Sequence, residues 1–90
     1  MKTRYGIVSA LTRLELLLGV SKEVIAVHTT LTTSHVLKPL LEDFGFAVQL
    51  EESPFGDYFV DLLIFLPENK SILEIKQWIE RTKHDTLSRH

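Results

Sequence analysis

The side chains that could do chemistry in this 90-residue chain are few, and their spacing excludes several kinds of site. The chain has no cysteine, which excludes disulfides and thiolate nucleophiles. Its histidines, at positions 28, 35, 84 and 90, show no metal-ligand spacing with one another or with carboxylates, so we expect structural or solvent-exposed roles for them. The four glycines are scattered, and no phosphate-binding loop is predicted. We therefore expect no cofactor.

One constellation of charged residues has a spacing that occurs in enzymes. Asp61 lies in the apolar run F-V-D-L-L-I-F, and the later run I-L-E-I-K contains Glu74 and Lys76. This arrangement resembles the D…(D/E)-x-K signature of the PD-(D/E)xK nucleases. The resemblance implies that the two carboxylates bind a divalent metal, that Lys76 helps to activate water, and that Glu42 adds a carboxylate from a helix. The opposing interpretation is a cross-strand or capping charge, because Ser71 with Glu74 also fits a capping box.

Length and composition restrict the class of protein. Ninety residues make one domain, residues 1–90, with a single core. Hydrophobic residues make up 44% and charged residues 24%, as in globular proteins. The longest apolar runs are far shorter than the roughly 20 residues of a membrane span. Arg13 interrupts the first apolar stretch too early for a signal peptide. We expect a cytoplasmic protein that does not bind membranes.

The charge is unevenly distributed along the chain. The formal net charge is −2, but residues 46–66 contain four acidic residues, Glu51, Glu52, Asp57 and Asp61, and no lysine or arginine. Residues 1–30 carry a net charge of +2, from four basic and two acidic side chains. A polyanion such as DNA would be repelled by residues 46–66 unless the chain ends made the contact.

The periodicity of apolar residues predicts three helices and one hairpin. A spacing of three and four residues indicates helices at 4–18, 33–44 and 71–84. In the first of these the stripe begins at Tyr5. Alternation predicts a half-buried strand at 46–52, and the nearly continuous apolar run at 58–66 predicts the more central strand. The helix at 71–84 precedes a polar tail from residue 85.

Glycine and proline mark the boundaries of these elements. Gly45 is expected to end the second helix, and residues 53–57 contain the proline and glycine of the hairpin turn. Pro39 falls inside that helix, where it removes a backbone hydrogen bond at a cost of about 3 kcal/mol. We therefore expect the helix to begin late, near Ser34 or His35.

The segment 21–31 is compatible with two structures, and this choice decides the fold. Val20, Val24, Val27 and Leu31 have helical spacing, with Ser21 as the N-cap. The same segment is rich in β-branched residues, which favour a buried strand. The helical interpretation predicts a winged helix-turn-helix of the α+β class, with a β-hairpin wing and a C-terminal helix. The strand interpretation predicts an α-β-α-β-β-α fold with a three-stranded sheet.

The helical interpretation is joined by a resemblance to a known family. The run V-L-K-P-L-L at residues 36–41 resembles the recognition helix of PadR-like regulators and of small winged-helix proteins of archaeal viruses. The resemblance implies that residues 46–66 form the wing and that residues 72–83 form a dimerisation helix. The residues that would then face the DNA major groove are Thr32, Thr33, Ser34, His35 and Lys38. The alternative is that they form the solvated start of an ordinary helix.

Three functional hypotheses follow. The first is a small winged-helix protein, either a DNA-binding transcriptional regulator or a protein-interaction derivative of one, that forms a homodimer through its terminal helices. The second is a noncatalytic, homo-oligomeric α+β interaction module, whose partner would cover exposed aromatic residues at Phe55, Tyr58, Phe59 and Trp78. The third is the metal-dependent nuclease. We choose the first and expect a binding protein rather than an enzyme.

Overall fold

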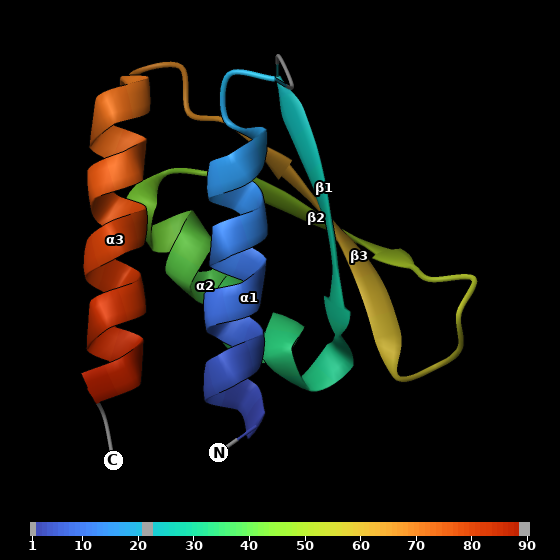
Figure 1. Ribbon diagram of the computed structural model, residues 1–90. Coiled ribbons are helices and arrows are strands. Elements are labelled where there is room, and N and C mark those ends of the chain that lie inside the picture. Colours follow the sequence, from blue (N-terminus) through green and yellow to red (C-terminus); the bar gives the residue numbers. More distant parts are fainter. Residues whose placement is uncertain (1, 21–22, 89–90) are drawn as a thin grey trace.

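A computed structural model, which describes residues 2–20 and 23–88, has three helices on one side of a three-stranded sheet (Figure 1). The sheet has the order β1-β3-β2, and both pairs of strands are antiparallel. The α+β class predicted from the sequence is confirmed. The elements are α1 (Lys2–Leu17), β1 (Val24–Thr30), α2 (Leu31–Phe44), β2 (Ala47–Glu52), β3 (Phe59–Phe65) and α3 (Ile72–Ser88).

The segment whose structure the sequence left open forms strand β1. Its residues alternate, with Ile25, Val27 and Thr29 buried and the intervening side chains exposed. The helical interpretation placed Val24 and Leu31 on one stripe with Val27, but both are exposed, so that interpretation is wrong. The β-branched side chains favour an extended backbone, and β3 supplies the backbone hydrogen-bond partners.

A winged-helix architecture is consequently not confirmed. A helix-turn-helix needs two consecutive helices joined by a short turn, whereas the described residues between β1 and β2 form α2 alone. The segment expected as the first helix of that pair became a strand, and its expected N-cap, Ser21, lies outside the described residues. The observed order of elements is that of the alternative prediction, α-β-α-β-β-α.

Helix α2 begins directly after β1, earlier than Pro39 led us to expect. The hydroxyl of Thr30 accepts a hydrogen bond of 3.1 Å from the backbone N–H of Thr33, which makes Thr30 the N-cap. Pro39 therefore lies in the helix interior, with its ring exposed. The lost backbone bond costs about 3 kcal/mol. Burial of Leu37 and Leu41 offsets that cost, since each side chain contributes about 1.5–3 kcal/mol.

The predicted end of α2 and the predicted hairpin are confirmed. Gly45 ends the helix with φ of 127°, and its N–H donates to the carbonyl oxygens of Leu41 and Glu42 at 3.2 and 3.1 Å. This positive φ favours glycine. The turn between β2 and β3 contains Gly56 at φ of 118°. Strand β3 lies between the other two strands, as its apolar run predicted.

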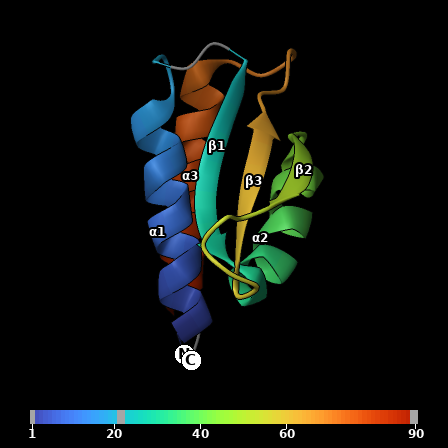
Figure 2. The ribbon, with the colours of Figure 1, turned by 90° about the vertical axis from the view of Figure 1, so that its right-hand side faces the viewer.

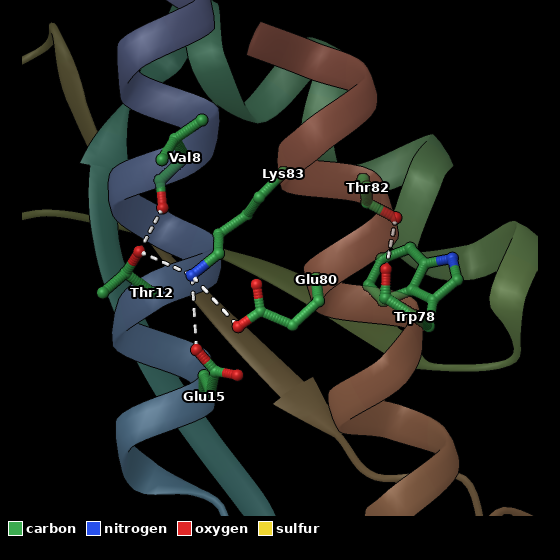
Figure 3. A network of polar contacts seen from close by, with 7 residues as sticks. All are labelled: Val8, Thr12, Glu15, Trp78, Glu80, Thr82 and Lys83. Atoms are coloured by element: carbon green, nitrogen blue, oxygen red, sulfur yellow. Dashed lines mark hydrogen bonds and ion pairs between the residues drawn. The ribbon is translucent and has the colours of Figure 1, made fainter.

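Helices α1 and α3 lie side by side and are joined by a polar network (Figure 3). The Nζ of Lys83 lies 3.4 Å from the hydroxyl of Thr12 and 3.3 Å from a carboxylate oxygen of Glu15, both on α1. Glu80 of α3 lies 4.0 Å from the same ammonium group. Residues 85–88 continue α3, although the sequence predicted a polar tail there.

The core lies between the helices and one face of the sheet. Tyr5, expected on the buried stripe of α1, is 62% exposed. Ile7 and Ala10 face the core at this end of the helix instead. Trp78, which the interaction-module hypothesis expected to be exposed, is half-buried and packs against the core, where it stacks on Phe44 with ring centroids 4.8 Å apart. Within the described residues, no helix has the length and hydropathy needed to span a membrane. The core residues are Ile7, Ala10, Leu11, Leu14, Leu18, Ile25, Val27, Leu37, Leu41, Phe46, Leu62, Ile64, Ile75 and Ile79.

Candidate functional site

The sheet has a face that no described helix covers, which we call the open face (Figure 2). Strand residues alternate between two faces, and the buried residues of β1 and β3 define the face toward the helices. The strand register then assigns the remaining side chains to the open face. They are Val24, Ala26, His28, Thr30, Ala47, Gln49, Glu51, Phe59, Asp61, Leu63 and Phe65.

One half of the open face is apolar. Val24, Phe65 and Ala47 form one row across the three strands, and Ala26 and Leu63 begin the next row. Val24 is 41% and Phe65 is 39% exposed, the two alanines are exposed, and Leu63 is half-buried. We call these five side chains the apolar patch. Side chains in adjacent strands lie about 5 Å apart, so the patch is continuous.

The other half of the open face holds a histidine–aspartate pair flanked by aromatic rings. The Nδ1 of His28 on β1 lies 2.8 Å from Oδ1 of Asp61 on β3. The imidazole stacks on the ring of Phe59, with centroids 5.2 Å apart, and meets the ring of Phe55 edge-on at 5.4 Å. Phe55 comes from the turn between β2 and β3, which therefore folds over this half of the face.

This pair corresponds to part of a catalytic triad. A carboxylate only accepts hydrogen bonds, so Nδ1 of His28 carries the hydrogen, as in the orienting pair of a catalytic triad. A triad also needs a nucleophile on the second ring nitrogen. In residues 2–20 and 23–88, no hydroxyl is hydrogen bonded to that atom. The side chains of His28 and Asp61 are 43% and 34% exposed, a setting in which an ion pair contributes about 0–1 kcal/mol.

The residues predicted to contact DNA do not form one exposed surface. Thr33 and Ser34 are buried, and the Ser34 hydroxyl donates a 2.6 Å hydrogen bond to the carbonyl oxygen of Leu31. These two side chains complete the first turn of α2 and cannot reach a groove of DNA. Thr32 and His35 are exposed on the same turn. The burial follows from the early start of α2, which places this turn beneath β1 and α1.

Lys38, the basic residue of that set, is engaged in an ion pair. Its Nζ lies 2.9 Å from Oε2 of Glu42 one turn later in α2. The pair neutralises the charge that would meet a phosphate. Glu51 and Asp61, directly opposite each other in β2 and β3, place two acidic groups on the open face. Lys38 and the open face thus offer a polyanion little attraction.

The residues of the proposed nuclease constellation are not brought together. Asp61 lies on the open face, whereas Glu74 and Lys76 lie on α3, on the helical side of the sheet. Glu74 instead forms the predicted capping box: its carboxylate accepts from the Ser71 N–H, and the Ser71 hydroxyl accepts from the Glu74 N–H, both at 3.1 Å. Glu42 belongs to the surface ion pair described above.

The histidines lead to the same conclusion about metals. His35 and His84 are exposed on separate helices, and His90 lies outside the described residues. Across the part of the chain that the structure describes, no three histidine or acidic side chains are grouped so that they could hold a metal ion.

The outer edge of β1 presents backbone groups that neither β2 nor β3 pairs with. The Leu31 N–H donates to the Tyr58 carbonyl at 2.7 Å, and the Leu66 N–H donates to the Glu23 carbonyl at 3.1 Å. In an antiparallel pair, every second residue exchanges hydrogen bonds with its partner. These two bonds show that the backbone N–H and C=O groups of the odd-numbered residues of β1 are hydrogen bonded to β3. The N–H and C=O groups of Ala26 and other even-numbered residues point away from the sheet.

A groove of about 950 Å³ lies beside this edge. One wall is α1, through Gly6, Ser9, Ala10 and Arg13. The other is the second half of β1, residues 27–30, joined by Tyr58 and Phe59 at the start of β3. The first turn of α2 closes one end. Figures 1 and 2 both show α1 running alongside β1. The groove and the open face are thus two surfaces that meet along β1.

The open face was missed in the sequence, although a signal for it existed. Residues 58–66 form a nearly continuous apolar run, which places apolar side chains on both faces of a strand. That run predicts a central position for the strand. It is equally typical of a strand that is covered on both faces, and Phe59, Leu63 and Phe65 lie on the second of these faces.

Comparison with known proteins found no matching family model, no matching curated protein and no matching solved structure.

Proposed function

We propose that this protein is a noncatalytic interaction module that forms a homodimer through the open face of its sheet. The observation that supports this proposal is the apolar patch, which continues over three strands and is accessible to solvent. Larger contiguous apolar patches on soluble proteins commonly mark interaction sites. A domain of this size buries only about 60% of the surface that its unfolded chain exposes. A subunit interface on the patch would add apolar burial to a small core.

A second copy of the chain is the occupant that fits the patch. None of its five side chains is charged, so two copies related by a two-fold axis bring the same patch together without repulsion. The acidic side chains Glu51 and Asp61 lie in the neighbouring half of the face, outside the patch. Two sheets packed face to face leave about 10 Å for the side chains between them, which the patch side chains can fill.

The terminal helices are a less suitable dimer surface. α1 and α3 pack on each other within the chain, and Lys83 ties their facing sides together. Exposed apolar side chains do occur on their outer sides, among them Leu16 and Leu73. These residues allow the two dimer surfaces to be compared by experiment.

Sedimentation equilibrium of matched leucine-to-glutamate variants tests the proposal. Leu63→Glu puts a charge in the apolar patch, whereas Leu73→Glu puts the same charge on the outer side of α3. We expect the unmodified protein and Leu73→Glu to be dimers at about 0.1 mM, a concentration at which micromolar dimers are populated. We expect Leu63→Glu to be a folded monomer. A monomeric unmodified protein, or a dimer disrupted by Leu73→Glu and not by Leu63→Glu, would overturn the proposal.

A further inference from the structure

We propose a second binding site, separate from the dimer surface: the groove between α1 and the free edge of β1 binds an extended, acidic segment of a partner protein. The segment would pair with β1 as an additional strand of the sheet. The proposal rests on three observations, namely the direction of the backbone groups of β1, the shape of the α1 wall and the charge of the groove.

The backbone of β1 is prepared for a further strand. The N–H and C=O groups of Ala26 and His28 point away from β3 toward the free edge, as the hydrogen-bond pattern requires. Proteins usually protect such edges with charged residues or proline. The sequence of β1, V-I-A-V-H-T-T, contains no lysine, carboxylate or proline. An extended peptide can therefore gain main-chain hydrogen bonds along this edge, as in strand-addition complexes.

The α1 wall leaves room for that strand. Gly6, Ser9 and Ala10 line the groove, and their small side chains leave space between the helix and the edge of β1. Gly6 also lies close to α2, because a Cβ there would collide with the hydroxyl of Thr33. The first turn of α2 then bounds one end of the groove. The space is a slot along the strand edge, which suits an extended segment better than a helix.

The charge of the groove selects an acidic segment. Arg13 lines the groove, is exposed, and forms no ion pair with any described residue. Among the described residues that line the groove, none is acidic. Asp61, the acidic residue that the strand register places beside β1, is paired with His28 on the open face. An acidic side chain of the incoming strand would meet Arg13, and the attraction would decrease as salt is added.

A second copy of β1 does not fit this position. In each copy α1 lies beside β1 (Figure 2). If two copies paired through their β1 edges, the α1 helix of each copy would lie where the β1 strand of the other has to be. The groove therefore suits a segment that has no helix attached along its side.

Fluorescence anisotropy with synthetic peptides tests the inference on the unmodified protein. The probe is an end-blocked peptide of about eight alternating valine and glutamate residues, within the normal length of a strand. We expect it to bind at least about tenfold more tightly than the same peptide with lysine for glutamate, because complementary charge favours the acidic form. A version whose alternate backbone nitrogens are methylated should lose binding, since it cannot pair as a strand. Equal binding by the methylated or the lysine peptide would overturn the inference.

Two variants of one residue separate the backbone contribution from the side-chain contribution. His28→Pro removes the outward N–H at the centre of the edge, a position where proline is compatible with an edge strand. His28→Ala removes the same imidazole contacts but keeps the N–H. We expect at least about tenfold weaker binding of the acidic peptide by His28→Pro than by His28→Ala, with circular dichroism as the check of folding. Equal affinities of two folded variants would overturn strand addition. If His28→Pro does not fold, the methylated peptide decides the question.

The result is independent of the proposed homodimer. Leu63→Glu lies on the open face, outside the groove lining, and should leave the affinity for the acidic peptide within about twofold. Arg13→Glu should reverse the preference between the acidic and the lysine peptide. If the dimer test fails and the peptide still binds, only the proposed function is wrong. An unchanged preference in Arg13→Glu would overturn the acidic assignment of the segment.

Discussion

The two edges of the sheet differ in how they are protected from pairing with another strand. The outward backbone groups of the β2 edge belong to Val48, Leu50 and Glu52, since β3 uses the alternate residues. That edge carries two consecutive glutamates and is followed by the run S-P, features that disfavour an added strand. The β1 edge carries no formally charged side chain, and its neighbour is the groove.

The difference shows that an edge strand can be protected from further pairing either by charged side chains or by a neighbouring helix that restricts access to it. The β2 edge faces solvent and depends on negative charge. The β1 edge depends on α1, which restricts access to one slot. An edge that is restricted in this way can bind a particular kind of segment, whereas a charged edge excludes strands of any sequence. The variants below change either β3, the central strand that pairs with both edge strands, or one edge strand at a time.

Truncation of a buried side chain in β3, the strand between the two edge strands, should have the largest effect on the free energy of unfolding. Leu62 lies at the centre of β3 with 0% exposure. Leu62→Ala should lower the free energy of unfolding by about 2–5 kcal/mol, because it removes buried methyl groups and leaves a cavity. Leu50→Ala, at the β2 edge where the side chain is 40% exposed, should cost less than about 1 kcal/mol. Urea denaturation measures both, and equal losses would show that β3 is not the common support.

A methyl group on the α1 wall of the groove should have the next largest effect. Gly6→Ala forces its Cβ against the Thr33 hydroxyl, which accepts a 2.9 Å hydrogen bond from Thr30 and so has little freedom to move. Overpacking costs about 1–3 kcal/mol, and the better helix propensity of alanine returns up to about 1 kcal/mol. We expect a net loss of about 1–2 kcal/mol.

The matched control is Ser9→Ala, an exposed position of the same helix, which should change the free energy of unfolding by no more than about 0.5 kcal/mol. Thr33→Ala should relieve the clash in a double-mutant cycle. Additive effects of Gly6→Ala and Thr33→Ala would contradict the close approach.

Neutralisation of the β2 edge should change association more than stability. The double variant Glu51→Gln/Glu52→Gln removes two charges that disfavour strand pairing there. We expect a change in unfolding free energy within about 0.5 kcal/mol and a rise in concentration-dependent light scattering. Glu68→Gln/Asp85→Asn removes the same charge away from both edges and serves as the control. If the control scatters as strongly, net charge and not edge protection determines the association.

The polar pair between β1 and β3, formed by His28 and Asp61, should contribute little to the free energy of unfolding. His28 and Asp61 are joined by a 2.8 Å contact but are 43% and 34% exposed. A double-mutant cycle of His28→Ala and Asp61→Asn should give a coupling energy of about 0.2–1 kcal/mol, the usual value for an exposed pair. A coupling above about 2 kcal/mol would show that Phe55 and Phe59 shield the pair from water.

Features that depend on a few neighbouring residues could be predicted from the sequence. The capping box of Ser71 and Glu74, the helix stop at Gly45 and the hairpin turn all have local causes, namely side-chain hydrogen bonds and a positive φ. The central place of β3 followed from its apolar run. The predicted late start of α2 was wrong, because the burial of Leu37 and Leu41 outweighs the free-energy cost of Pro39 inside the helix.

The sequence by itself determined a small α+β chain with a helix, a hairpin and a last helix in known order, because periodicity and capping act over a few residues. Tertiary structure alone decided that residues 24–30 form a strand, since that depends on pairing with β3, whose residues follow 29 to 41 positions later. With β1 in the sheet, one face of the sheet stays open and the β1 edge lies beside α1. Both proposed binding surfaces are consequences of that one long-range contact.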